Sequence, residues 1–305
     1  MARRRFVTVD VFTDRAFGGN PLAVVLDSGQ LSTAQMQAVA REFNYAETTF
    51  VLPPREPGHD AWVRIFTPTR ELPFAGHPNV GTAFVLTRQG VGNGRHLVFE
   101  EGAGLVPLNI LRDGDTVTGA ELTAPQRLAR GGEMPVAELA ACLSLILQDV
   151  ATAAHPPLVA SVGLEFVIAE LSDREALRRM QVDAAAFRRF LPREGTGAVF
   201  AYVREPGRRE TAGVQARMFA PLGDIGEDPA TGSASCALVA LLADLAPEPE
   251  LDLRLRVEQG VDMGRPSLLR ARARKVAGEV VEVQVGGGCV PMFEGSFELA
   301  GEAAD

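Results

Sequence analysis

A long internal repeat constrains the fold of this chain more than any other feature. Residues 66–86 and 219–240 share one order of features: a strand ending in Phe-x-Pro, a loop, Pro-x-x-Gly-[Thr/Ser]-Ala and an apolar helix. His77–Ala83 and Asp228–Ala234 align at an offset of 151. Common capping residues could produce one such match by chance. A series of matches in the same order favours two similar domains, each made of strands around one central buried helix.

A further parallel supports the repeat and sets the expected domain limits. Glu101–Gly104 and Gln259–Gly264 each follow an expected strand. We therefore predict an N-terminal domain over residues 1–122, completed by a C-terminal strand at 288–300, and a second domain over residues 123–287.

Local patterns predict most of the remaining elements. Residues 124–136 are rich in Pro, Gly and Arg and are expected to form a crossover linker, whereas the glycines at 286–288 are expected to break the last strand. Apolar periodicity and capping residues predict four further helices. These are Ser32–Phe43, Val136–Gln148, Asp173–Met180 and Asp183–Phe190.

Composition excludes several classes of function. The net charge of −9 and the absence of a basic stripe argue against a nucleic-acid partner. Three widely spaced cysteines give neither a disulfide framework nor a zinc pattern, so a reducing, cytoplasmic compartment is expected. The longest apolar run, Cys236–Ala246, is too short to span a membrane. The only lysine, Lys275, lies in an alternating segment typical of a strand face, so no Schiff-base lysine precedes it.

The helix starts of the two copies are candidate anion sites. Helix N-termini carry unpaired N–H groups, and small residues at Asn79–Thr82 and Ala230–Ser233 leave that backbone accessible. If both helices point into a shared cleft, their N–H groups can bind an anionic substrate or a developing enolate.

The repeat is unequal at the position before its shared proline, where one copy has His77 and the other Asp228. Glu47, at the entrance to a β-branched strand, is a third candidate, since burial would tune its carboxyl for proton transfer. These groups suit proton removal and return at carbon. Structural alternatives stay open: Asp228 as a helix cap, His77 as a core histidine and Ser233 as a small packing residue.

Five motifs together resemble the PhzF-like phenazine biosynthesis family, and the resemblance extends from Phe6 to about Leu299. The motifs are Gly19-Asn20-Pro21-Leu22-Ala23-Val24-Val25, Ala46-Glu47-Thr48-Thr49-Phe50, Ala75-Gly76-His77-Pro78-Asn79-Val80-Gly81-Thr82-Ala83, Glu227-Asp228-Pro229-Ala230-Thr231-Gly232-Ser233-Ala234 and Gln259-Gly260-x-x-Met263-Gly264-Arg265-Pro266-Ser267.

The resemblance implies an α+β protein with the diaminopimelate epimerase-like fold. In that fold, two pseudo-symmetric domains each wrap a curved, mixed or antiparallel, barrel-like sheet round a central helix, and the active site lies between them. It also implies a cofactor-independent, metal-free isomerase of a small carboxylate-bearing molecule such as trans-2,3-dihydro-3-hydroxyanthranilate. The implied catalytic residues are Glu47, His77, Asp228 and Ser233, and the implied substrate-binding residues are Gly76, Asn79, Gly81, Thr82, Thr231 and Gly232.

Two other functions stay open within the same fold. Amino-acid racemases and epimerases of this fold use two cysteines at positions resembling His77 and Asp228, and neither residue is cysteine here. A non-catalytic ligand-binding protein is the second alternative. A homodimer is an expectation of the resemblance alone.

Overall fold

The computed structural model describes residues 2–193, 195–204, 212–223 and 225–299, and the chain divides into two compact units. Unit 1 comprises Met1–Phe17, Pro21–Leu122 and Gly287–Asp305, and unit 2 comprises Gly18–Asn20 and Thr123–Gly286. The main difference from the expected limits is the three-residue segment Gly18–Asn20, which belongs to unit 2. Ala300, the last residue of the expected C-terminal strand, lies outside the described residues.

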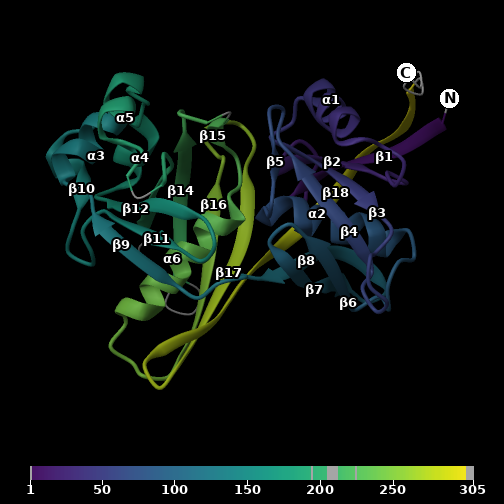
Figure 1. The fold of residues 1–305 in the computed structure, drawn as a ribbon. Helices are drawn as coiled ribbons and strands as arrows, with labels where there is room; N and C mark the ends of the chain where they lie inside the picture. The colour runs from purple at the N-terminus through teal and green to yellow at the C-terminus, as the bar shows by residue number, and fades with distance from the viewer. Residues whose placement is uncertain (1, 194, 205–211, 224, 300–305) are drawn as a thin grey trace. The chain divides into compact units, whose positions relative to one another are not determined.

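Unit 1 is a curved mixed sheet around the buried helix α2. Every residue of α2 from Gly76 to Thr87 is buried, and the helix packs against β1, β3 and β7 (Figure 1). The elements of this unit are β1 (Ala2–Val11), β2 (Asn20–Val25), α1 (Thr33–Phe43), β3 (Glu47–Leu52), β4 (Ala61–Phe66), β5 (Glu71–Leu72), α2 (Gly76–Arg88), β6 (His96–Glu101), β7 (Gly104–Asp113), β8 (Thr116–Thr123) and the second half of β18 (Glu279–Leu299).

Unit 2 repeats this plan around helix α6, which packs against β16, β17, β11 and β12 (Figure 1). None of the helices in the described residues is long and apolar enough to cross a membrane. The elements of unit 2 are β9 (Ala129–Glu133), α3 (Val136–Leu143), a 3-10 turn (Leu147–Asp149), β10 (Val150–Ala151), β11 (Leu158–Ser161), β12 (Glu165–Leu171), α4 (Arg174–Arg179), α5 (Ala184–Phe190), β13 (Val199–Arg204), β14 (Ala212–Ala220), β15 (Ile225–Asp228), α6 (Gly232–Leu245), β16 (Leu251–Gln259), β17 (Ser267–Val276) and the first half of β18.

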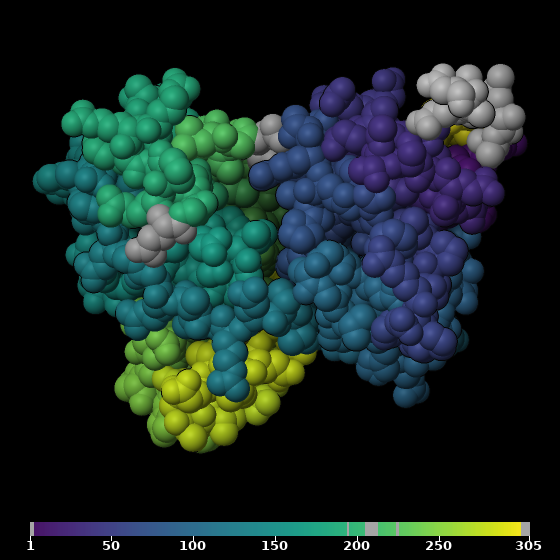
Figure 2. All heavy atoms as spheres, viewed as in Figure 1, coloured from purple at the N-terminus to yellow at the C-terminus, as the bar shows by residue number. Residues whose placement is uncertain are grey.

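The peripheral helices follow their local capping signals. Ser32 and Gln35 form a capping box at the start of α1, and Asp173 and Asp183 accept backbone N–H groups at the starts of α4 and α5. These helices lie at the surface of their own units, as α1 and the α4–α5 segment show in Figure 2. The central helices differ because burial rather than capping stabilises them: neither has a side-chain cap at its N-cap residue.

Three local predictions were wrong. The expected linker 124–136 contains strand β9, which pairs with β11. Helix α3 ends at Leu143 instead of Gln148 because Ser144 adopts the left-handed conformation. The glycines at 286–288 do not break β18. The strand runs through them from unit 2 into unit 1, and a Cβ on Gly288 would lie 2.7 Å from the Thr13 carbonyl oxygen.

The two units repeat the same strand–helix–strand topology. In unit 1, β4 pairs antiparallel with β5 and parallel with β6, and β6 pairs antiparallel with β7. In unit 2, β14, β15, β16 and β17 pair in the same way. The helix lies between the second and third strands of each series along the chain. The internal repeat seen in the sequence is therefore a repeat of structure.

The register of the repeat differs from the expected offset of 151. Helix α2 begins at Gly76 and α6 at Gly232, which gives an offset of 156. His77 consequently corresponds to Ser233, not to Asp228. The strand pairing supports the offset of 156, because Ile65 pairs with Leu72 as Met218 pairs with Asp228, which makes Leu72 the counterpart of Asp228. The sequence alignment matched two Pro-x-x-Gly motifs that lie at different distances from the helix start.

The single lysine closes the C-terminal end of α6. Lys275 is 5% exposed, and its Nζ donates to the carbonyl oxygens of Asp244 (3.1 Å) and Ala246 (2.8 Å). A cation at this end satisfies carbonyls that have no intrahelical partner and complements the helix dipole. Lys275 is therefore a structural residue of unit 2.

We predict that Lys275→Met destabilises the protein by about 1–3 kcal/mol, because two buried carbonyl groups lose their charged donor. The free energy of unfolding in urea measures the effect. Arg274→Met on the same strand is the matched control, since the Arg274–Glu282 pair is substantially exposed and its loss should cost less than about 1 kcal/mol. Equal destabilisation by both variants would contradict the assigned role of Lys275.

Candidate functional site

In unit 1, Glu47 and His77 lie side by side at the start of α2. Glu47 is the first residue of β3 and His77 the second residue of α2, and they are 7% and 5% exposed. Glu47 Oε2 lies 3.4 Å from His77 Nε2, too far for a strong hydrogen bond. Burial lowers the pKa of His77 to about 3. The imidazole is therefore neutral at pH 7, so this contact is not an ion pair.

The other predicted site residues of unit 1 differ in whether their polar atoms already have hydrogen-bond partners. The Asn79 amide donates to the Ala75 carbonyl at the helix start (3.0 Å), while its buried Oδ1 accepts no hydrogen bond from the part of the chain that the structure describes. Gly76, the first residue of α2, is buried. The hydroxyl of Thr82 shares a hydrogen bond with Thr49 (2.8 Å). A Cβ on Gly81 would lie 2.6 Å from the Leu22 side chain, so close packing accounts for this glycine.

In unit 2, Asp228 is the centre of a buried polar cluster. Asn20 Nδ2 donates to its Oδ1 (2.8 Å), and the Thr231 hydroxyl donates to its Oδ2 (2.5 Å). Burial raises the pKa of Asp228 to about 6; the bonds from Thr231 and Asn20 oppose that shift, and the charge of Glu227 adds to it. Asp228 is not the N-cap of α6, because it ends strand β15 and Thr231 occupies the cap position.

Asn20 reaches Asp228 because a short segment of the N-terminal region is attached to unit 2. Arg265 donates to the carbonyl oxygens of Gly18 (2.7 Å) and Gly19 (2.8 Å), and Gly19 donates to that of Pro266 (3.1 Å). These contacts account for the grouping of Gly18–Asn20 with unit 2. The Gly-Asn-Pro motif indicated a loop, but its sequence did not reveal the partner of Asn20.

Gln259, the last residue of β16, fixes the start of α6. Its Oε1 accepts from the Thr231 backbone N–H (3.0 Å), and its Nε2 donates to the Asp228 carbonyl (2.8 Å) and to Thr231 Oγ1 (2.9 Å). The glycine after it is required: Gly260 has φ +71°, and a Cβ there would lie 2.6 Å from the Pro229 carbonyl oxygen. Gly232 is buried and Ser233 half-buried in the first turn of α6.

Glu101, which the sequence aligns with Gln259, is a candidate functional residue that the sequence analysis did not propose. Trp62 pairs with Glu100 as Gln215 pairs with Glu258, so Glu101 occupies in unit 1 the position of Gln259 in unit 2. Both carboxyl oxygens of Glu101 are buried, and neither has a hydrogen-bond partner among the described residues. Burial raises its pKa to about 8, and the Asn79 side chain opposes this shift. At pH 7 a neutral acid thus stands where unit 2 has a neutral amide.

The cysteines lie apart from these clusters, in the cores. Within the described residues, Cys142, Cys236 and Cys289 form no disulfide bond, and all three are buried. Burial raises the pKa of Cys142 to about 11 and raises that of Cys289 still further. The described residues also contain no group of three His, Cys, Asp or Glu side chains arranged to hold a metal ion.

We predict that Glu101→Gln removes a pH dependence of stability. The Glu101 carboxyl has a pKa of about 4.5 in the unfolded chain and about 8 in the folded protein. Its contribution to stability is therefore fully present below pH 4.5 and is lost as the pH rises to about 8. Stability of the parent protein, relative to Glu101→Gln, should therefore fall by up to about 1.4 kcal/mol per pH unit in that window. Urea unfolding at pH 5, 7 and 9 measures the difference. The control Glu279→Gln changes an exposed glutamate, so the pH dependence of its free energy of unfolding should match that of the parent. If Glu101→Gln also shows the parent's pH dependence, the Glu101 carboxyl does not have the raised pKa.

Comparisons with known proteins agree with this architecture. An uncharacterised isomerase from Mesorhizobium japonicum is 37% identical over 97% of this chain and 99% of its own. Trans-2,3-dihydro-3-hydroxyanthranilate isomerase from Pseudomonas chlororaphis is 35% identical over 96% of this chain and 99% of its own. The crystal structure of a PhzF-family phenazine biosynthesis protein from Bacillus anthracis superposes with a TM-score of 0.85 at 25% identity, covering 98% of this chain and all of that one.

More distant structures confirm the fold class. A hydroxyproline epimerase from Agrobacterium vitis superposes over 97% of this chain and 91% of its own with a TM-score of 0.61 at 13% identity. The predicted diaminopimelate epimerase-like fold and the prediction of an isomerase family are both confirmed. The model of the family described as phenazine biosynthesis-like protein matches residues 9–295, and the chain belongs to that family.

Proposed function

We propose that this protein is a cofactor-independent isomerase that moves a proton between carbons of trans-2,3-dihydro-3-hydroxyanthranilate or a close carboxylate-bearing analogue. The observation that carries the proposal is the buried Glu47 carboxyl beside a neutral His77 at the start of α2. The 35% identity to an enzyme named for that substrate supports it.

In the proposed reaction, Glu47 is both base and acid. Its carboxylate takes a proton from a carbon of the substrate, and the electron pair left behind spreads through the conjugated system. The same carboxyl then returns the proton to a different carbon, so the molecular formula is unchanged. A neutral imidazole suits this cycle, because His77 can hydrogen-bond the substrate or the carboxyl without fixing Glu47 in one charge state.

The remaining groups are proposed to hold the substrate. The N-terminus of α6 lacks a side-chain cap, so backbone N–H groups at Gly232 and Ser233 can bind the substrate carboxylate. Asp228 is proposed to accept a hydrogen bond from the amino or hydroxyl group while Thr231 and Asn20 hold its carboxylate in place.

A two-thiol epimerase is less compatible with these residues. All three thiols are buried, and burial raises the pKa values of Cys142 and Cys289, which keeps those thiols protonated at neutral pH. The likeness to hydroxyproline epimerase shows the fold and carries no argument about chemistry.

We predict that Glu47→Gln lowers turnover of trans-2,3-dihydro-3-hydroxyanthranilate by about 10²–10⁴-fold, since the amide can neither accept nor return the proton. Product formation and deuterium incorporation from D₂O measure this loss. Glu42→Gln, on the exposed side of α1, is the control and should retain the parent rate. Full turnover in Glu47→Gln would exclude the mechanism, and a parent protein without turnover or exchange would favour a ligand-binding role.

We also predict that kcat/KM falls as pH decreases through about 6, where Asp228 becomes protonated and loses its negative charge. The sign follows from the role: the ionised form accepts the substrate hydrogen bond, so activity is present above the pKa and lost below it. Asp228→Asn should be slow at every pH and lack this acid limb. An unchanged limb in Asp228→Asn would assign the titration to another group.

A further inference from the structure

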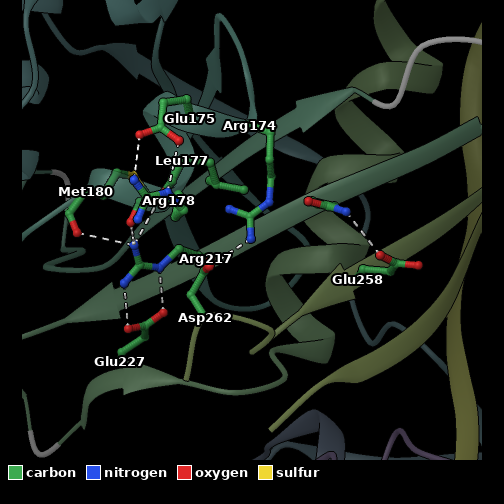
Figure 3. A network of polar contacts seen from close by, with 10 residues as sticks. Arg174, Glu175, Leu177, Arg178, Met180, Arg217, Glu227, Glu258 and Asp262 are labelled. Carbon is green, nitrogen blue, oxygen red and sulfur yellow. Dashed lines mark hydrogen bonds and ion pairs between the residues drawn. The ribbon is translucent and has the colours of Figure 1, made fainter. Parts of the chain in front are cut away.

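A partly buried arginine–glutamate pair holds the strand that ends in Asp228. Arg217 on β14 is 9% exposed, and its guanidinium forms two parallel bonds to Glu227 on β15, Nε to Oε1 (2.7 Å) and Nη2 to Oε2 (2.9 Å) (Figure 3). The remaining Nη1 donates to the carbonyl oxygens of Leu177, Arg178 and Met180 at the end of α4 (Figure 3). A bidentate pair of this kind fixes both position and orientation.

The same pair recurs in unit 1. Arg64 on β4 binds Glu71 on β5 through Nε (2.7 Å) and Nη2 (2.6 Å). Strand register makes the two pairs equivalent, because Phe66 pairs with Glu71 as Phe219 pairs with Glu227. Both guanidinium groups also lie over the phenylalanine two residues further on, at 5.2 Å from Phe66 and 4.8 Å from Phe219. The pair is thus part of the repeated framework.

The residue after the glutamate differs between the units. In unit 1 it is the apolar Leu72, and in unit 2 it is Asp228. Two adjacent acids in a partly buried strand repel each other, and a nearby guanidinium offsets that repulsion. Only in unit 2 is the glutamate of the repeated pair followed by a second acid.

We propose that Arg217 is a positioning residue for Asp228: through Glu227 it fixes β15 and balances the neighbouring charge, so that Asp228 is ionised at neutral pH. The catalytic part of this inference rests on the proposed function, whereas the ionisation of Asp228 does not. Other groups facing Asp228 from the packed elements of unit 2 are the uncharged Asn20, Thr231 and Gln259. Charged groups on those elements have partners of their own: Arg174 binds Asp262, Arg256 binds Glu258, and Arg265 binds the Gly18 carbonyl.

The test measures the titration of Asp228 directly. In protein labelled with ¹³C at aspartate carboxyl carbons, the Asp228 signal is assigned by its loss in Asp228→Asn and followed from pH 4 to 8. Arg217→Met leaves the Glu227 charge unbalanced, so the midpoint should move up by about half a pH unit or more. Glu227→Gln removes that charge and should move it down. The double variant Arg217→Met/Glu227→Gln should lie between the two single variants.

Arg64→Met is the matched control. It breaks the equivalent pair beside Leu72, so it should lower stability without moving the Asp228 midpoint. Unchanged midpoints in both Arg217→Met and Glu227→Gln would overturn the proposal, as would an equal shift in Arg64→Met. If Arg217→Met does not fold, the Asp228 midpoint in Glu227→Gln decides: a downward shift supports the proposal, and an unchanged midpoint overturns it. If the proposed function is correct, the acid limb of kcat/KM should move together with the Asp228 titration midpoint in each variant. If the midpoints shift but the protein shows no turnover, the isomerase proposal is refuted and the positioning role of Arg217 still holds.

Discussion

The structure depends on the burial of two helix starts. Helices α2 and α6 lie inside curved sheets, so their first N–H groups cannot all reach water, and neither N-cap residue supplies a side-chain acceptor. Such groups must find other acceptors, because an unpaired buried donor costs about 1–3 kcal/mol. In unit 2, Gln259 accepts the Thr231 N–H from the end of a neighbouring strand. The N–H groups beyond the cap residue remain suited to an anionic ligand.

Pseudo-symmetry explains both the stability of this arrangement and its chemistry. Arginine–glutamate pairs hold β5 and β15, and side chains at matching positions, Asn79 and Ser235, both donate to the carbonyl of the N-cap residue. Polar groups on this framework then differ between the units. Unit 1 places a carboxyl and a neutral imidazole together, whereas unit 2 holds a single acid among neutral donors. Because the titratable groups of the two units lie in different environments, they have different proton affinities, which suits acid–base chemistry near neutral pH.

The burial of ionisable side chains lowers the stability of this arrangement. Burial lowers the pKa of His77 and raises those of Asp228 and Glu101, so each is poised away from its ordinary value. Only Asp228 has several hydrogen bonds that oppose the shift; Glu101 has one opposing contact, from Asn79. Clusters of perturbed groups of this kind are typical of functional sites. Their position at the start of the repeated helices is what connects the fold to the proposed proton transfer.

The sequence by itself determined the family, the fold class, the duplicated plan and most helix starts, because these follow from motif order, periodicity and capping residues that act over a few positions. Glu47 and His77 were both selected from the sequence as candidate residues, and the structure places Glu47 Oε2 3.4 Å from His77 Nε2. Tertiary structure decided the register of the repeat, since pairing between strands, not the spacing of Pro and Gly, places Leu72 opposite Ile65 and Asp228 opposite Met218. It also brought Asn20 to Asp228 across 208 positions of the chain and buried the carboxyl of Glu101 at the position that Gln259 has in unit 2. Burial and long-range pairing set those contacts, and neither leaves a local pattern in the sequence.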